Sequence, residues 1–344
     1  MRCLGRILLA GLGLTVATAA SAEETIKVGV VRSVSNAALL ITQAKGYFKD
    51  VGLNVELEYL QSSSTGMASL AQGQLNIIAG GVSAGYFNAL DKKLPIIITV
   101  DRVTTPIGHN LMLRPDLKDT IKSIKDLKGK VIASNAPGSI STYEIGKILE
   151  TAGLSIDDVE IKNIPFGQYA PALKNKAVDA VLAIPPFTYS LTDTGLALPF
   201  ASADDIIKPT PMTIAVHLLN TDWAKPRQDL VRNFYIAMTR GIRDYCNGYH
   251  GGSTRKMLAD LLISSGNETR PELLDKYPWT ARNLNGKLNP ESLLDIQDWY
   301  VKHKFVKAKL PLEKLVDYSY ADYAQQKLGP YSIENKDSKL AGCR

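Results

Sequence analysis

The chain has 344 residues, of which 45% are hydrophobic and 22% are charged, and its formal net charge is +6 at pH 7. This length allows one large or two medium globular domains. The composition excludes a disordered, collagen-like or disulfide-dense chain, and a mean hydropathy of -0.05 excludes a polytopic membrane protein. Because 40 basic residues face 34 acidic ones without an arginine-rich block, we expect no nucleic-acid partner.

The N-terminal segment has the three parts of a secretory signal peptide. Arg2 and Arg6 precede an apolar stretch at 7–17, and Ala20-Ser21-Ala22 is a small-x-small cleavage motif. The apolar stretch is shorter than the about 20 residues of a transmembrane helix. No cysteine stands at the cleavage site for a lipid anchor. We therefore expect residues 1–22 to be removed after Ala22, which leaves 38 bases against 34 acids and a charge of about +4.

Two cysteines remain after this cleavage, Cys246 and Cys343. In an oxidising compartment they form either a disulfide that ties the C-terminal tail to a helix or two unpaired thiols. The sequence leaves both alternatives open. It contains no CxxC motif and so gives no support to redox chemistry.

Strands and helices alternate from residue 26 onward. An apolar strand at 26–31 leads through Ser33-Val34-Ser35-Asn36 into a helix with one apolar face, which Gly52 ends. Further elements of this first part are strands at 54–60, 75–79 and 95–100 and helices at 65–71 and from Ser83. This alternation predicts an α/β fold with mostly parallel sheets flanked by helices.

The same alternation starts again after Pro115. It predicts strands at 130–134, 159–164 and 178–184, and helices at 141–151 and 169–175. The chain from 229 onward is mainly helical, with predicted helices at 230–245, 255–263 and 292–302. No low-complexity linker separates the two α/β units, so we expect more than one strand-like crossing between two lobes.

The order of motifs resembles the periplasmic solute-binding proteins of ABC importers, in the sulfonate, nitrate and thiamine-precursor group. The most specific stretch is Ile124-Lys125-Asp126-Leu127-Lys128-Gly129-Lys130-Val131. Other matching motifs are Gly46-Tyr47-Phe48, Gly73-Gln74-Leu75-Asn76, Ala152-Gly153-Leu154, Val178-Asp179-Ala180 with Pro185-Pro186-Phe187, and Ile296-Gln297-Asp298-Trp299-Tyr300. Two departures concern the ligand: Asn76 stands where the family usually has Asp, and Ile184-Pro185 where sulfonate binders often have Trp before an acidic residue.

The resemblance implies a two-lobed type II periplasmic binding protein fold with two inter-lobe crossings, near 109–113 and 213–217. Lobe one would comprise 23–110 and 216–344, and lobe two 111–215. It also implies a monomer in the periplasm, without catalysis or cofactors. This protein would capture a small organic solute and deliver it to a permease with a cytoplasmic ATPase. Sulfonates, carboxylates, aromatic acids and thiamine-precursor-like heterocycles are the solute classes implied.

Candidate ligand-binding residues lie in loops that follow predicted strands, at 33–36, 80–83 and 135–142. Ligands of open α/β sheets bind at this edge, and helix starts there attract anionic groups. The candidates are Ser33, Ser35, Asn36, Gly81, Val82, Ser83, Arg102, Asn135, Gly138, Ser139, Ser141, Thr142, Phe166, Pro186 and Phe187, with Tyr86 as a further apolar wall. The alternatives are helix capping by Ser35, Ser83 and Ser141, core packing of the aromatic rings, and a local pair between Arg102 and Asp101.

Three other functions remain open on the sequence alone. Gly81-Val82-Ser83-Ala84-Gly85 matches the nucleophile elbow of a secreted serine hydrolase, with His250 or His303 as the available base. Some members of the group that the chain resembles are enzymes making thiamine pyrimidine or menaquinone precursors. A ligand-sensing partner of a membrane receptor would use the same cleft. The four histidines, which are His109, His217, His250 and His303, show no metal-binding spacing, so we expect no metal.

Overall fold

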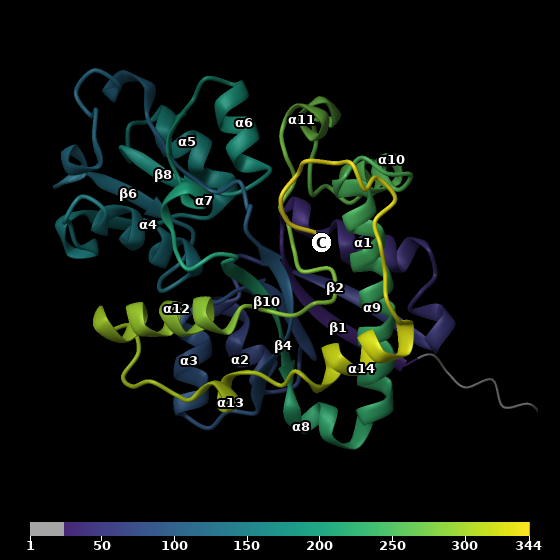
Figure 1. The fold of residues 1–344 in the computed structure, drawn as a ribbon. Helices are drawn as coiled ribbons and strands as arrows, with labels where there is room; N and C mark the ends of the chain where they lie inside the picture. Colours follow the sequence, from purple (N-terminus) through teal and green to yellow (C-terminus); the bar gives the residue numbers. More distant parts are fainter. Residues whose placement is uncertain (1–23, 344) are drawn as a thin grey trace, which may run out of the picture.

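The computed structural model describes residues 24–343 as two α/β bodies that lie side by side (Figure 1). The predicted signal peptide, residues 1–22, and its cleavage site lie outside the described residues. Within 24–343 no helix is both long and apolar enough to cross a membrane.

The sheet of the first body has the strand order β2-β1-β3-β10-β4. Its strands are β1 (Glu24–Val31), β2 (Leu53–Leu60), β3 (Ile77–Gly81), β4 (Ile96–Thr104) and β10 (Thr213–Asn220). β1 pairs in parallel with β2 and β3, whereas β10 is antiparallel to both β3 and β4. All strands except β10 therefore point the same way.

The sheet of the second body repeats this arrangement in the order β7-β6-β8-β5-β9. Its strands are β5 (Asn110–Leu113), β6 (Val131–Ser134), β7 (Glu160–Asn163), β8 (Ala180–Ala183) and β9 (Leu198–Ser202). β6 is parallel to β7 and β8, and β5 is antiparallel to β8 and β9. In each sheet the reversed strand is the one that follows a passage from the other body.

The chain passes between the sheets at 105–109, after β4, and at 203–212, after β9. The expected crossings near 109–113 and 213–217 are wrong by several residues, because those segments belong mostly to β5 and β10. These segments are indeed strands, but they pair within the sheets. The passages between the bodies are irregular apart from the short helix α7 (Ala203–Ile206).

The two passages are hydrogen-bonded to each other. The Thr105 N–H donates to the Met212 carbonyl at 3.1 Å, and the Met212 N–H donates to Thr105 Oγ1 at 2.9 Å. The Asp204 carboxylate accepts from the N–H groups of Ile107 and Gly108, at 2.7 and 2.9 Å. The connection between the bodies is therefore a pair of linked segments.

Helices cover both faces of the first sheet. Alternation along β3 sends Ile77 and Ala79 to one hydrophobic cluster and Ile78 to another, as the two-residue period of a strand requires. One cluster contains side chains of α1 (Ala37–Ala44), α9 (Gln228–Tyr249), α10 (Arg255–Ser264) and α14 (Ser319–Leu328). The other contains those of α2 (Met67–Ala71), α3 (Ala84–Asp91), α12 (Pro290–Lys302) and α13 (Leu312–Leu315). The short helix α8 (Thr221–Ala224) follows β10.

The second body carries α4 (Ile140–Glu150), α5 (Tyr169–Lys174) and α6 (Phe187–Asp193) around its sheet. Figure 1 shows α12 lying between α4 and α3, so this C-terminal helix reaches the second body. Asp295 on α12 accepts a hydrogen bond from the Tyr143 hydroxyl at 2.6 Å and pairs with Lys147 at 3.1 Å. The expected helices at 141–151, 169–175 and 292–302 correspond to α4, α5 and α12.

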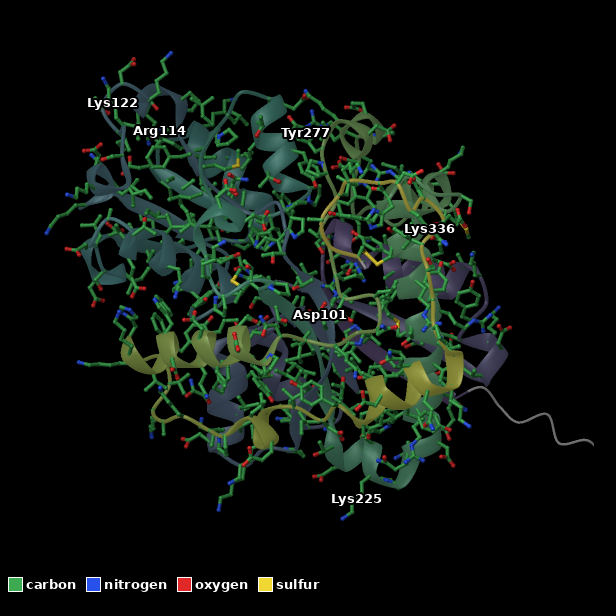
Figure 2. All side chains as sticks on the ribbon, in the orientation of Figure 1. Asp101, Arg114, Lys122, Lys225, Tyr277 and Lys336 are labelled. Atoms are coloured by element: carbon green, nitrogen blue, oxygen red, sulfur yellow. A yellow bond between two sulfur atoms is a disulfide. The ribbon has the colours of Figure 1, made fainter. Side chains whose placement is uncertain are left out.

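A second contact between the bodies involves α11 (Pro271–Lys276) and α6. Asp193 at the end of α6 pairs with Arg270 at 2.9 Å and with Lys276 at 2.5 Å. The ring of Tyr277, labelled in Figure 2, stacks on Tyr189 with centroids 4.6 Å apart. The bodies thus meet on two sides, at α12 and at α11.

Cys246 on α9 forms a disulfide with Cys343, and the two Cα atoms lie 5.2 Å apart. Both residues are buried. Of the two alternatives that the sequence left open, the disulfide is confirmed. It fixes the C-terminal tail against α9, near the end of the chain marked in Figure 1.

Candidate functional site

A cavity lies between the two bodies and receives side chains from both. It holds about 580 Å³ of space between atoms, part of which is open to solvent. Most of its residues follow the C-terminal ends of strands, where ligands of open α/β sheets bind. The lining residues of this inner cavity are Val31, Ser33, Ser35, Ser62, Ser63, Gly80, Gly81, Arg102, Val103, His109, Asn135, Ser139, Ile140, Phe166, Ile184, Pro185, Ile214, Ala215 and Thr280.

A second space adjoins the first and shares Val31 and Phe166 with it. It holds about 960 Å³, again including solvent. We call it the outer cavity, and its other lining residues are Arg32, Tyr59, Leu60, Gln61, Pro165, Gly167, Pro186, Phe187, Ser190, Gly266, Asn267, Glu268 and Thr269. Together the two spaces form one cleft between the bodies.

Many of the candidate residues line this cleft. Ser33, Ser35, Gly81, Arg102, Asn135, Ser139 and Phe166 line the inner cavity, and Phe166, Pro186 and Phe187 line the outer one. The remaining candidates, Asn36, Val82, Ser83, Gly138, Ser141 and Thr142, do not line either space. Asn36 contributes indirectly, because its Oδ1 accepts a hydrogen bond from Arg102.

Burial and packing explain why some of the candidate residues do not line the cleft. Ser83 and Ser141 are fully buried in the protein interior. Gly138 has φ +57 and packs against Ala84, whose N–H donates to the Gly138 carbonyl across the bodies at 2.9 Å. Tyr86, expected as an apolar wall, is a core residue that donates its hydroxyl proton to the Leu315 carbonyl.

The capping alternative is wrong for Ser35 and Ser141, which lie within helical turns and not at their starts. Ser83 occupies the N-cap position of α3, but its side chain makes no capping hydrogen bond there. The N-cap of α4 is Ser139, which also makes none and lines the inner cavity. The start of α4 therefore meets the cavity without a side-chain cap.

Arg102 is the cationic side chain of the inner cavity and is 96% buried, since its exposed fraction is 4%. Its guanidinium donates to Asn36 Oδ1, and its Nε has no partner among residues 24–343. Over the same residues, it forms no ion pair with Asp101 or any other carboxylate. The predicted local pair between Arg102 and Asp101 is therefore wrong.

Asp101 has contacts different from those of Arg102. Its Oδ2 accepts the Asn283 N–H at 3.0 Å, and the nearby positive charge is that of Arg282. Burial raises the pKa of Asp101 to about 7. Figure 2 places Asp101 near the middle of the molecule, close to β4.

Burial and like charge act on the basic groups near this strand. Burial, with a contribution from the neighbouring Arg282, lowers the pKa of Arg102 to about 9, which leaves it a cation at neutral pH. Burial and the same two guanidinium groups lower the pKa of His217 to about 3. Arg102 therefore keeps its charge without a counter-ion in the described part of the chain, while His217 stays neutral.

His109 lines the inner cavity at the end of the first passage between the bodies. Its Nδ1 lies 2.7 Å from Oε1 of Glu144, which is fully buried on α4. The Glu144 carboxylate orients the His109 ring through this contact, and Glu144 itself does not line the cavity.

Two phenylalanine rings form an apolar wall where the cavities meet. Phe166 and Phe187 stack with centroids 5.5 Å apart and an interplanar angle of 20°. Both belong to the second body, so they face the loops that follow β1 and β2. A flat organic group can pack on such a surface.

The sequence pattern does not single out Ser62, Ser63, His109 or Glu268 as ligand-binding residues, although all of them line the cleft. Ser62 and Ser63 belong to a run of three serines that begins two residues after the end of β2, and this pattern is a usable signal. His109 and Glu268 lie outside the strand–loop–helix pattern. Only the tertiary fold brings them to the cleft.

The nucleophile-elbow interpretation is not supported by the geometry around Ser83. Its Oγ is buried without a hydrogen-bond partner among the described residues. His250 bonds instead to Ser338 and Gly342, and His303 to Glu150. Among residues 24–343 no histidine is therefore hydrogen-bonded to Ser83, as a general base would be. Over residues 24–343, no three His, Cys, Asp or Glu side chains gather in a way that could hold a metal ion.

Comparison with known proteins gives relatives of two kinds. A candidate thiamine biosynthesis protein of Haemophilus influenzae is 27% identical over 176 residues, which is 50% of this chain and 53% of that protein. The chain thus matches about half the length of this relative. A candidate binding protein of Bacillus subtilis, YtlA, is 23% identical over 326 residues and 92% of each chain.

Solved structures share the fold at low sequence identity. The periplasmic nitrate-binding protein NrtA of Synechocystis PCC 6803 has a TM-score of 0.73 at 15% identity, over 93% of this chain and 91% of that chain. The alkanesulfonate-binding protein SsuA of Xanthomonas axonopodis pv. citri has 0.71 at 16%, over 87% and 100%. The desulfurization enzyme DSZB has 0.64 at 14%, over 89% and 100%. The chain has the fold of the periplasmic binding proteins, as the sequence predicted.

A family model described as NMT1/THI5 like matches residues 34–248. This range includes the strands β2 to β10 and residues from both walls of the cleft. It spans more than half of the chain, and the chain therefore belongs to the NMT1/THI5-like family.

Proposed function

We propose that this protein is the periplasmic substrate-binding component of an ABC importer. It captures a small organic solute in the cleft and delivers it to a permease that works with a cytoplasmic ATPase. The observation that carries this proposal is a cavity lined by two bodies whose sheets are joined by two linked passages. Such a geometry couples solute binding to closure, because a solute that contacts both bodies favours the closed arrangement.

The relatives support this role. NrtA and SsuA are named for binding nitrate and alkanesulfonate, and YtlA is named as a binding protein. We propose export, cleavage after Ala22 and a monomeric mature protein, with the lobes divided at 105–109 and 203–212. We also propose that the cleft performs no chemistry. The buried, unpartnered Ser83 and the disulfide that occupies both mature cysteines support this absence of a nucleophile.

Thermal unfolding in the presence of sulfonates, carboxylates, aromatic acids and pyrimidine heterocycles tests this function. A solute that binds the folded protein at 100 times its Kd stabilises it by about 2.7 kcal/mol and raises the melting temperature. Small-angle scattering with that solute is expected to show a smaller radius of gyration. A protein that none of these classes stabilises, or that hydrolyses an ester probe, would contradict the proposal.

A further inference from the structure

The inner cavity has an unbalanced positive charge. Arg102 lines it, 96% buried and without a carboxylate partner, and no Asp or Glu is among the described residues that line it. Glu144 does not line the cavity, and its carboxylate contacts the His109 ring and not Arg102. A buried charge without a partner is costly, so the site favours a ligand that supplies the opposite charge.

Uncharged donors surround the same space. The hydroxyl groups of Ser33 and Ser35 lie 2.6 Å apart, so they share one hydrogen bond and one hydroxyl proton is left for a ligand. Ser139 and Ile140 bring the uncapped start of the eleven-residue helix α4 to the cavity. Backbone N–H groups at a helix start bind anions. The hydroxyl and backbone N–H donors and the positive charge of Arg102 therefore all favour an anionic group in the inner cavity.

The rest of the lining is apolar. Val31, Ile140, Ile184 and Ile214 border the inner cavity, and the stacked pair of Phe166 and Phe187 continues it outward. A small inorganic anion would leave this surface uncovered. An organic body attached to the charged head would cover it and gain the free energy of apolar burial.

In the outer cavity, the carboxylate of Glu268 favours a hydrogen-bond donor or a cation instead of an anion. This side chain is 95% buried, its Oε1 accepts from the N–H groups of Thr269 and Arg270, and its Oε2 has no partner among the described residues. Arg32 also lines the outer cavity, where it lies over the Tyr59 ring at 3.9 Å and donates to the carbonyls of Ser265 and Gly266. A second anionic group next to Glu268 would meet a carboxylate whose Oε2 has no partner among the described residues.

We propose that the solute is an organic monoanion with its charged head against Arg102 and an uncharged or cationic hydrogen-bond donor toward Glu268. This inference rests on the proposed function of solute capture in the same cleft. It selects acids over neutral heterocycles, and it selects monoanions and zwitterions over dianions. Arg102 and Glu268 are then the two residues that set specificity.

Titration calorimetry with matched probes tests this inference. The probes are benzoate with benzamide and butyrate with butyramide as acid–amide pairs, butanesulfonate, terephthalate as a dianion, 4-(aminomethyl)benzoate as a zwitterion, and pyrimidine as a neutral ring. We expect the acid to bind at least tenfold more tightly than its amide in at least one pair, and the zwitterion more tightly than the dianion.

Two variants locate the effect. Arg102→Gln is expected to bring the acid-to-amide affinity ratio close to one, whereas Arg102→Lys keeps a preference for the acid. Glu268→Gln is expected to improve terephthalate binding relative to the zwitterion. Arg232→Gln on α9 and Glu313→Gln on α13 are the controls. Each removes a charge of the same sign at a position that does not line the cleft. The melting temperature of each solute-free variant shows whether it folds.

The outcomes distinguish the two proposals. Binding of pyrimidine or of the amides as tight as that of the acids would overturn the inference and leave solute capture intact. Equal acid preference in wild type and Arg102→Gln would also overturn it. If no probe binds, the inference fails for these organic acids. If, in addition, no solute class of the broader thermal screen stabilises the protein, the proposed function fails with it.

Discussion

Adjacent residues on one strand have opposite roles at this cleft. Asp101 and Arg102 follow each other on β4 at a β-bulge. Asp101 pairs with Val216 and Val103 with Ala215, so Arg102 is the extra residue between them. Asp101 interacts with Arg282, whereas Arg102 lines the inner cavity.

The buried imidazole of His217 gives a pH dependence of stability. Its folded-state pKa of about 3 lies below its ordinary value of 6.5. Between these values only the unfolded chain binds the proton, so stability is present above pH 6.5 and is lost as the pH falls. We expect the free energy of unfolding of wild type, measured relative to His217→Gln, to fall by about 2 kcal/mol from pH 6.5 to pH 5.

Denaturant titrations at several pH values measure this difference. The raised pKa of Asp101 acts in the opposite direction, because a carboxyl group that stays protonated in the folded state loses stability as the pH rises from about 4 to 7. That effect is common to both proteins and cancels in the comparison. Parallel stability curves for wild type and His217→Gln would disprove the assignment.

Gly81 lies at a close approach of the two bodies in the inner cavity. A Cβ atom at this position would lie 2.7 Å from Cγ2 of Ile140, which belongs to the other body. Gly81→Ala is therefore expected to hinder closure and to weaken solute binding about tenfold, since overpacking of this kind costs about 1–3 kcal/mol. The measurement is the Kd of the tightest-binding probe.

The matched control is Gly167→Ala in the outer cavity, where an added Cβ meets no atom within 4 Å. We expect this variant to bind like wild type. Equal binding by Gly81→Ala and wild type would show that the bodies do not need this close approach.

Sequence reasoning located several cleft residues because the loop after a parallel strand must face the ligand edge of the sheet. Ser33, Asn135 and Ser139 were predicted for this reason and do line the cleft. Ser141 and Thr142, predicted for the same reason, line neither cavity. They are the second and third residues of α4 and are buried, and loop composition does not show at which residue a helix begins.

At the scale of elements, the sequence predicted the parallel part of each sheet and not the reversed strand. The strands expected at 26–31, 54–60 and 130–134 correspond to β1, β2 and β6. The sequence predicts crossings near 109–113 and 213–217. Those stretches pair within the sheets, because an antiparallel strand can join a sheet without a helical crossover, and local patterns carry no information on the pairing partner.

The contact between α6 and α11 is expected to stabilise the closed arrangement. Asp193→Asn removes the carboxylate that pairs with Arg270 and Lys276 across the two bodies. We expect a larger radius of gyration for the solute-free variant and solute binding that is a few-fold weaker. Small-angle scattering and calorimetry measure the two effects.

Asp229→Asn is the matched control, because Asp229 pairs with Arg232 on α9 within the first body. This variant is expected to leave the radius of gyration unchanged. If Asp193→Asn scatters like this control, the ion pairs do not influence closure.

At the scale of the whole molecule, the disulfide closes a long loop. Cys246 and Cys343 are 97 residues apart in sequence, and the segment between them includes α10 to α14. We expect the Cys246→Ser/Cys343→Ser double variant to lose about 2–5 kcal/mol of unfolding free energy, since the crosslink restricts the unfolded chain. Urea titration measures the loss.

Reduction provides the control for this prediction. A strong reductant under unfolding conditions is expected to lower the stability of wild type to that of the double variant and to leave the double variant unchanged. A wild-type protein whose stability is insensitive to reductant would contradict the prediction.

The linked passages at 105–109 and 203–212 have a consequence for the way the molecule moves. Two connecting segments that are hydrogen-bonded to each other act as one hinge. Such a hinge bends readily about one axis and resists sliding and twisting of the two bodies. Arg102 and His109, which lie close to or within these passages, would stay almost still while the stacked rings of Phe166 and Phe187 move together with the second body. A solute that enters the open cleft would then find Arg102 already in its binding position, and only the rotation of the two bodies would remain.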